Sequence, residues 1–185
     1  MWRILLAAAI VLSAFIPAPA RGQEIAGPDV RLQNSEIYVS FSLGLAPREV
    51  REIREGIDKE LKFYIDLFRV WNVWPDEFVL GKVFTRKLKA DPIKKEYVAT
   101  SSDGSVIIER RFRSFESMLS WTLSVQDLKL ANTRELEPGQ YFVRITAESK
   151  IRKLPPVIGQ FIIFLSENEF KIKKDSRLIT VEGPR

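Results

Sequence analysis

The sequence predicts a mainly β protein, an antiparallel β-sandwich of immunoglobulin-like general form with two short helices. Two observations predict this fold class. Several segments alternate apolar and polar residues with the two-residue period of a strand. The connections between them are short, as in antiparallel hairpins, and no strand–helix–strand alternation runs long enough for a parallel sheet. A curved sheet with a helical lid is the alternative architecture.

The first 22 of the 185 residues are typical of a secretory signal peptide. Arg3 precedes an uncharged run from Ile4 to Ile16, and the small residues Ala18 and Ala20 follow it. The run is shorter than the about 20 residues of a membrane-spanning helix. We therefore expect residues 1–22 to be a cleaved signal peptide, with a retained membrane anchor as the alternative. A cleaved signal predicts that the protein is periplasmic or secreted.

The remaining chain is expected to form one domain. Residues 23–33 are polar and predict a flexible lead-in, and residues 34–182 predict the sandwich itself. Strand-like segments occupy residues 36–45, 57–71, 77–88, 96–100, 106–112, 140–148, 169–174 and 177–181. Val157–Leu165 is apolar enough to be either a short helix or a buried strand, and its pattern does not separate the two.

Helix and turn signals fall between these strands. Pro47 suits the first turn of a helix that Gly56 would end, and Ser114 is a candidate N-cap for a second helix. That second helix has one apolar face, with Met118 near its centre. Asp103-Gly104 between two β-rich segments predicts a hairpin turn.

Cysteine and histidine are both absent, and their absence excludes several kinds of chemistry. The chain cannot form a disulfide or a thiolate nucleophile, and it lacks the usual imidazole base and zinc ligand. We expect no cofactor and no metal. A hydrolase using carboxylates or a Ser–Lys pair stays as an unfavoured alternative.

The net charge of the chain is +5. Loss of residues 1–22 removes Arg3 and Arg21 and no acid, so the net charge of the remaining chain is +3.

Two groups of residues are candidate contact sites. Trp71 and Trp74 end a strand just before a Pro turn. The favoured interpretation is that they plug the end of the sandwich, and the alternative is that they contact a partner. Arg110, Arg111 and Arg113 form a basic cluster that protects a sheet edge or binds an acidic partner or an anionic membrane surface. An exported protein seldom meets nucleic acid, so no nucleic-acid partner is expected.

The order of these features resembles the domain of unknown function 4390 family of exported bacterial proteins, over residues Val30 to Val181. The resemblance rests on Glu36–Leu45, Gly56, Leu61–Val70, Trp71, Trp74, Tyr97, Ser114-Phe115-Glu116, Pro138-Gly139-Gln140-Tyr141 and Leu154-Pro155. Genes of such families often lie beside those of membrane sensor kinases, so the resemblance implies an envelope role but no reaction, ligand or catalytic residue.

Taken together, these patterns predict a non-enzymatic, exported envelope protein, a periplasmic interaction module that is an accessory to a membrane sensor. Its partner would be an envelope or membrane protein. The alternative is an envelope protein that binds a lipid or another apolar ligand, suggested by Val157–Leu165 and by the Met118 face of the second helix.

Overall fold

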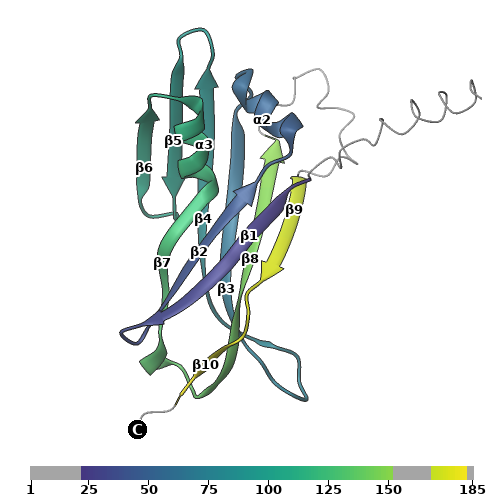
Figure 1. Ribbon diagram of the computed structural model, residues 1–185, viewed down its shortest axis with the longest axis vertical. Helices are drawn as coiled ribbons and strands as arrows, with labels where there is room; N and C mark the ends of the chain where they lie inside the picture. The colour runs from purple at the N-terminus through teal and green to yellow at the C-terminus, as the bar shows by residue number, and fades with distance from the viewer. Residues whose placement is uncertain (1–21, 152–167, 183–185) are drawn as a thin grey trace, which may run out of the picture.

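A computed structural model describes residues 22–151 and 168–182 (Figure 1). Within these ranges the chain forms ten strands, two α-helices and one 3-10 turn. The mainly β, antiparallel fold that the sequence predicts is confirmed. Val157–Leu165 and all but the last residue of the 1–22 segment lie outside the described residues.

Seven strands form the larger of two sheets. They are β3 (Lys59–Arg69), β4 (Glu77–Asp91), β5 (Glu96–Ser102), β6 (Ile107–Phe112), β8 (Gly139–Ile151), β9 (Asn168–Asp175) and β10 (Ile179–Val181). Their order is β10–β8–β3–β4–β5–β6, and β9 follows the same edge of β8 as β10 does. β3 lies at the centre, paired along its whole length with β4 and β8.

The smaller sheet contains β1 (Glu24–Gln33), β2 (Glu36–Gly44) and β7 (Ser124–Asn132) in the order β1–β2–β7. Residues 23–33 are therefore not a flexible lead-in, because nearly all of them pair with β2 as an edge strand. The ladder to β2 supplies the backbone partners, and an edge strand can keep a polar composition because most of its side chains face water. β7 is a strand that the sequence pattern did not indicate.

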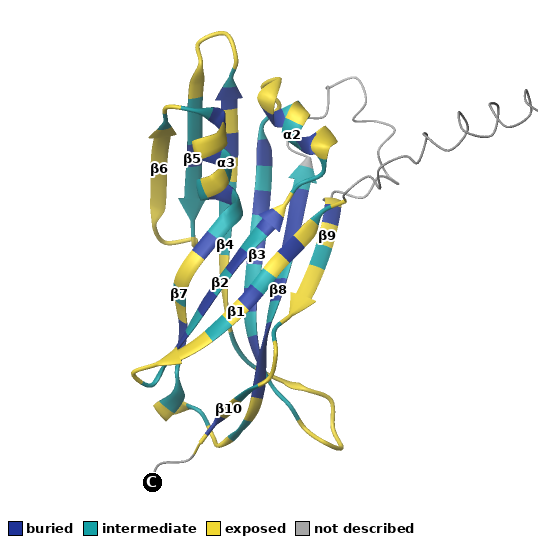
Figure 2. Ribbon diagram, in the orientation of Figure 1, coloured by how far each residue is buried: buried dark blue, intermediate teal, exposed yellow. Residues whose placement is uncertain are grey.

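The two sheets pack face to face around one core (Figures 1 and 2). Every second residue of β2 and β3 is buried between them, which is the alternation that the sequence predicts for a half-buried strand. The rings of Phe41 on β2 and Phe63 on β3 lie 5.7 Å apart, centroid to centroid, across the interface.

Two helices connect the sheets. α2 (Pro47–Arg54) joins β2 to β3, and its Ile53 is fully buried. Gly56 ends it in a left-handed conformation, with φ of 96°, as expected for a residue just after a helix. α3 (Phe115–Leu123) carries the chain from β6 to β7, and the Ser114 hydroxyl caps it by accepting from the Ser117 N–H at 3.1 Å. None of the described helices is long and apolar enough to cross a membrane.

Candidate functional site

The connection between β3 and β4, residues 70–76, carries the largest exposed aromatic side chains of the described structure. We call it the tryptophan loop, and it lies at the tip of a hairpin that is exposed at the lower right of Figure 2. Trp71 is 41% exposed, Val73 86% and Trp74 75%, and Phe78 at the start of β4 is also exposed. The favoured expectation, that the tryptophans plug the core, is wrong, because the hairpin extends beyond the core and leaves its tip in solvent.

Trp71 is held in place although it is partly exposed. Its Nε1 donates a hydrogen bond to Glu77 Oε2 at 3.1 Å, and the Arg69 guanidinium lies 4.3 Å from the centre of its ring. Arg69 in turn pairs with Glu137 and donates to the Pro138 carbonyl at 3.1 Å. The loop is therefore anchored at Trp71, while Trp74 and Val73 present apolar surface to solvent.

A hollow of about 320 Å³ lies beside the tryptophan loop. Its wall includes Trp71, Tyr141 and three glutamates, Glu77, Glu135 and Glu137. The Tyr141 hydroxyl donates to the Glu137 carbonyl at 2.6 Å, and burial raises the pKa of this phenol, so it stays neutral. With three carboxylates in its wall, this surface favours a cationic contact.

The predicted basic cluster does not form one patch. Arg110 and Arg111 are adjacent on β6 and therefore point to opposite faces of the sheet. The Arg110 guanidinium lies 5.4 Å from the centre of the Trp121 ring, whereas Arg111 faces solvent with its Nε 4.0 Å from Glu109 Oε1. Arg113 is exposed just after the strand. All three lie on the part of the sheet away from the tryptophan loop (Figure 1).

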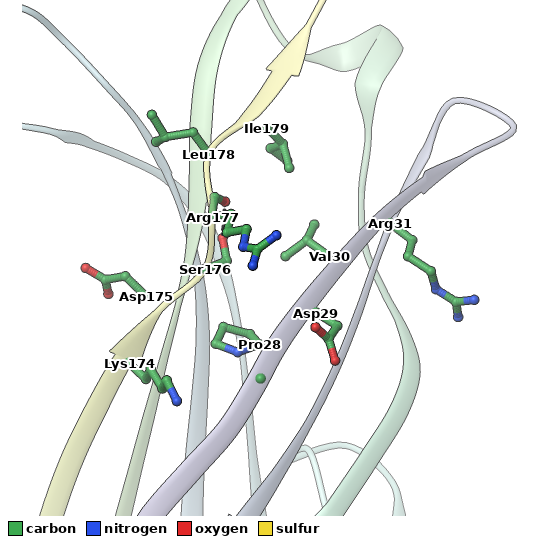
Figure 3. Close-up of a pocket in the computed structure, with 11 residues that line it drawn as sticks. Pro28, Asp29, Val30, Arg31, Lys174, Asp175, Ser176, Arg177, Leu178 and Ile179 are labelled. Carbon is green, nitrogen blue, oxygen red and sulfur yellow. Dashed lines mark hydrogen bonds between the residues drawn. The ribbon is translucent and has the colours of Figure 1, made fainter.

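A wider hollow of about 810 Å³ separates β1 from the segment that joins β9 to β10 (Figure 3). The side chains of Val30 and Arg177 point toward one another across it. Lys174 Nζ donates to the Ile25 carbonyl at 2.8 Å and so links β9 to β1, while Asp175 is paired with Arg144 instead. The hollow marks the open side of the sandwich, where the edge strands β1 and β9 of the two sheets are not paired through their backbones.

A buried lysine bears on the Ser–Lys alternative. Lys59 on β3 is only 4% exposed, and it binds Glu52 of α2 at 2.8 Å and Glu169 of β9. The Ser149 hydroxyl donates to Glu169 at 2.8 Å. Burial alone would lower the pKa of Lys59, but its hydrogen bonds to Glu169 and Glu52 outweigh this and raise it. Lys59 therefore holds its proton, and the cluster ties α2, β3 and β9 together rather than providing a base.

Metal-binding chemistry finds no support among residues 22–151 and 168–182. In those ranges no group of three or more acidic side chains converges as a metal would require, and the chain has no cysteine or histidine to complete such a set.

The fold and site thus define a two-sheet antiparallel β protein whose two exposed tryptophans lie together on one hairpin tip. The chain belongs to the family described as Domain of unknown function (DUF4390), which it matches over residues 20–177. The resemblance drawn from the order of sequence features is confirmed. No curated protein and no solved structure matches the chain.

Proposed function

We propose that this protein is a non-enzymatic interaction module of the cell envelope that binds an envelope or membrane protein through the tryptophan loop. One observation carries the proposal, the exposure of Trp74 and Val73 at the tip of an anchored hairpin. Exposed tryptophans are rare on a surface that has no partner, and they supply much of the binding energy of protein interfaces.

The charge around the loop supports a protein partner with basic groups. Asp76 lies in the loop, and the adjoining hollow adds Glu77, Glu135 and Glu137 against Arg69. This excess of negative charge would repel an anionic membrane surface and attract lysine or arginine side chains. Binding should therefore weaken as the salt concentration rises.

The envelope location rests on residues 1–22, whose pattern is that of a signal peptide. Isolation of the protein from its own cells and determination of its N-terminus tests this part. Cleavage near Gly22 supports export with removal of the signal, whereas a chain that begins at Met1 in the membrane fraction would indicate the retained anchor.

Site-directed photo-crosslinking tests the contact itself. A photoreactive amino acid replaces Val73 in the full chain, expressed in the cell that makes it. The matched control carries the same amino acid at Ile93, which is 92% exposed in the β4–β5 turn at the opposite end of β4. The proposal expects one discrete protein adduct from position 73 and none from position 93.

Competition then separates specific from accidental contact. Purified wild-type chain should suppress the adduct, and a chain with Trp71→Ala and Trp74→Ala should not. Equal adducts from both positions, or equal competition by both chains, would contradict the proposed function.

A further inference from the structure

A third hollow, about 420 Å³, lies between the edge of the smaller sheet and the inner face of β4, β5 and β6. We call it the Arg86 groove. Its apolar wall comes from three separate segments, with Phe84 on β4, Val106 and Ile108 at the start of β6, and Val125 and Leu128 on β7. α3 covers the neighbouring part of the same inner face and leaves the groove open. Its volume is within the range of small-molecule sites.

Arg86 brings a positive charge into this apolar setting. Its Nη1 donates to the carbonyl oxygens of Trp121, Thr122 and Ser124 at 2.6, 2.8 and 2.8 Å, at the carboxyl end of α3. The guanidinium also lies 4.9 Å from the Trp121 ring centre and 5.1 Å from that of Phe84. Arg86 is therefore fixed by one edge of its guanidinium.

Within the described part of the chain, the contacts of Nη1 leave the Nε atom without a hydrogen-bond partner and the positive charge without a carboxylate partner. Among the described residues, Nε is buried without a hydrogen-bond partner, and no carboxylate forms an ion pair with Arg86. Burial lowers the pKa of Arg86 to about 10, so the side chain still carries its full charge at neutral pH. Arg86 is half-buried, and a partly desolvated charge without a carboxylate partner is costly, so an anion in the groove would offset that cost.

Asp103 supplies the other charge of the groove wall, and its carboxylate forms no ion pair with Arg86. Asp103 lies at the end of the groove, but its Oδ1 accepts from the backbone N–H groups of Ser105 and Val106 at 2.9 and 2.8 Å. Those two hydrogen bonds lower its pKa and keep it ionised within its own turn. Gln126 and Ser101 are neutral, so Arg86 is the residue that brings positive charge to the groove wall.

We propose that the Arg86 groove binds a single-chain amphiphile, with its anionic head group on Arg86 and its hydrocarbon tail along Phe84, Ile108 and Leu128. Charge complementarity selects this occupant over a neutral apolar molecule, because the α3 carbonyl groups satisfy hydrogen bonds of the guanidinium and an anion would also supply its missing counter-ion. The small volume favours a single chain over a folded protein segment. The proposal is independent of the tryptophan loop, which precedes β4 and contributes no residue to the groove.

Isothermal titration calorimetry of the purified chain with three probes of equal tail length tests the head group. Dodecanoate and dodecyl phosphate are the anionic probes, and dodecanol is the neutral one. The proposal expects one site for an anionic probe and at least ten-fold weaker binding of dodecanol. The stronger of the two anionic probes identifies the head group as a carboxylate or a phosphate. Equal binding of dodecanol, or no binding of any probe at 1 mM, would overturn the proposal.

Variants locate the site. Arg86→Gln should weaken the anionic probes about ten-fold or more, but Arg86 also caps α3 and this change can disturb folding. Ile108→Asp provides a second variant, since Ile108 is half exposed and its carboxylate would face the bound tail and head group. The matched control is Ile107→Asp, on the same strand but on the opposite face of the sheet.

The proposal expects dodecanoate binding to be lost in Ile108→Asp and retained in Ile107→Asp, with both variants folded by circular dichroism. Equal binding by the two variants would overturn it. A chain that is dimeric in light scattering, becomes monomeric with Ile108→Asp and binds no probe would instead show that a second copy covers the groove, and this too would overturn it.

Discussion

Lys59 on β3 lies 2.8 Å from Glu52 on α2, measured from Nζ to Oε2, and its side chain is almost wholly buried. The same ammonium group pairs with Glu169 on β9, so one cation joins the consecutive elements α2 and β3 to a strand that lies far from both in the sequence. The two carboxylates keep about a fifth of their surface in solvent, which reduces the cost of burying the cluster. The cluster is a structural tie at the end of the sandwich that carries α2.

Replacing Lys59 by Met should destabilise the protein by about 3 kcal/mol, because Glu52 and Glu169 would then lose the buried cation that they share, and Glu52 would keep only its pairing with the exposed Arg48. Urea unfolding measures the free energy. The control is Lys87→Met, whose Nζ lies 3.9 Å from Glu60 with nearly half of the side chain exposed, and which should cost about 0.5 kcal/mol or less. Similar losses in the two variants would contradict the role assigned to Lys59.

Stability should be nearly constant between about pH 5 and 9 and should fall in acid. The chain has no histidine, and the cysteine that could titrate at the upper end is also absent. Hydrogen bonds from Lys59 and Arg48 lower the pKa of Glu52, and hydrogen bonding to Arg144 lowers that of Asp175. Each of these two acids has a lower pKa in the folded state than in the unfolded state, where the pKa is near 4. Its contribution to stability is therefore complete above the unfolded-state pKa and is lost as the pH falls through the folded-state pKa.

Two other groups act at different places on the pH scale. Burial raises the pKa of Asp66, so this residue opposes the trend in acid. The contribution of Lys59, whose pKa is raised, is complete below the unfolded value near 10.4 and is lost only above it. Urea unfolding at pH 3, 4, 5, 7 and 9 measures the profile, and Asp175→Asn should flatten its acid limb. A steep change between pH 6 and 8 would contradict this prediction.

Arg144→Lys should cost about 1 kcal/mol although it keeps the charge. The guanidinium makes two hydrogen bonds of 2.7 Å to Asp175 and lies 5.0 and 5.3 Å from the ring centres of Phe68 and Phe142. A lysine cannot make the paired hydrogen bonds or stack in this way. Thermal unfolding compares it with Arg111→Lys, which is exposed and should be neutral. Equal melting temperatures would show that charge alone matters at position 144.

Trp74→Ala should change the free energy of unfolding by about 0.5 kcal/mol or less, because the ring is mostly in solvent. Phe63→Ala, by contrast, should cost about 3–5 kcal/mol, since Phe63 is fully buried between Phe41 and Phe84. Urea unfolding of both variants checks the difference. A loss above about 2 kcal/mol for Trp74→Ala would mean that this ring belongs to the core, and it would remove the main support for the interaction site.

Local patterns predicted the elements whose signals are local. The alternation over residues 36–45 and 61–67 identified β2 and β3, Asp103-Gly104 identified the β5–β6 hairpin, and Ser114 marked the start of α3. In each case the informative residues are neighbours in the chain, so the sequence records their relationship directly.

The two strands that the pattern missed lie at the edges of the smaller sheet. β1 has a register shift between Ala26 and Asp29, and the pairing of β7 with β2 has two more. Each shift breaks the two-residue period, and Asp127 on β7 takes a positive φ of 49°. Such strands exist because a partner strand pairs with them, and the partner is not visible in their own composition.

The sequence alone established the β class, the absence of thiol and imidazole chemistry, and the presence of two unusual tryptophans, since these depend on composition and short-range periodicity. The exposure of Trp74, the separation of Arg110 from Arg111 and the isolation of Arg86 in an apolar groove emerged only from the folded chain. Burial and charge compensation depend on which segments come together across the two sheets, and these contacts join residues that are remote in the sequence.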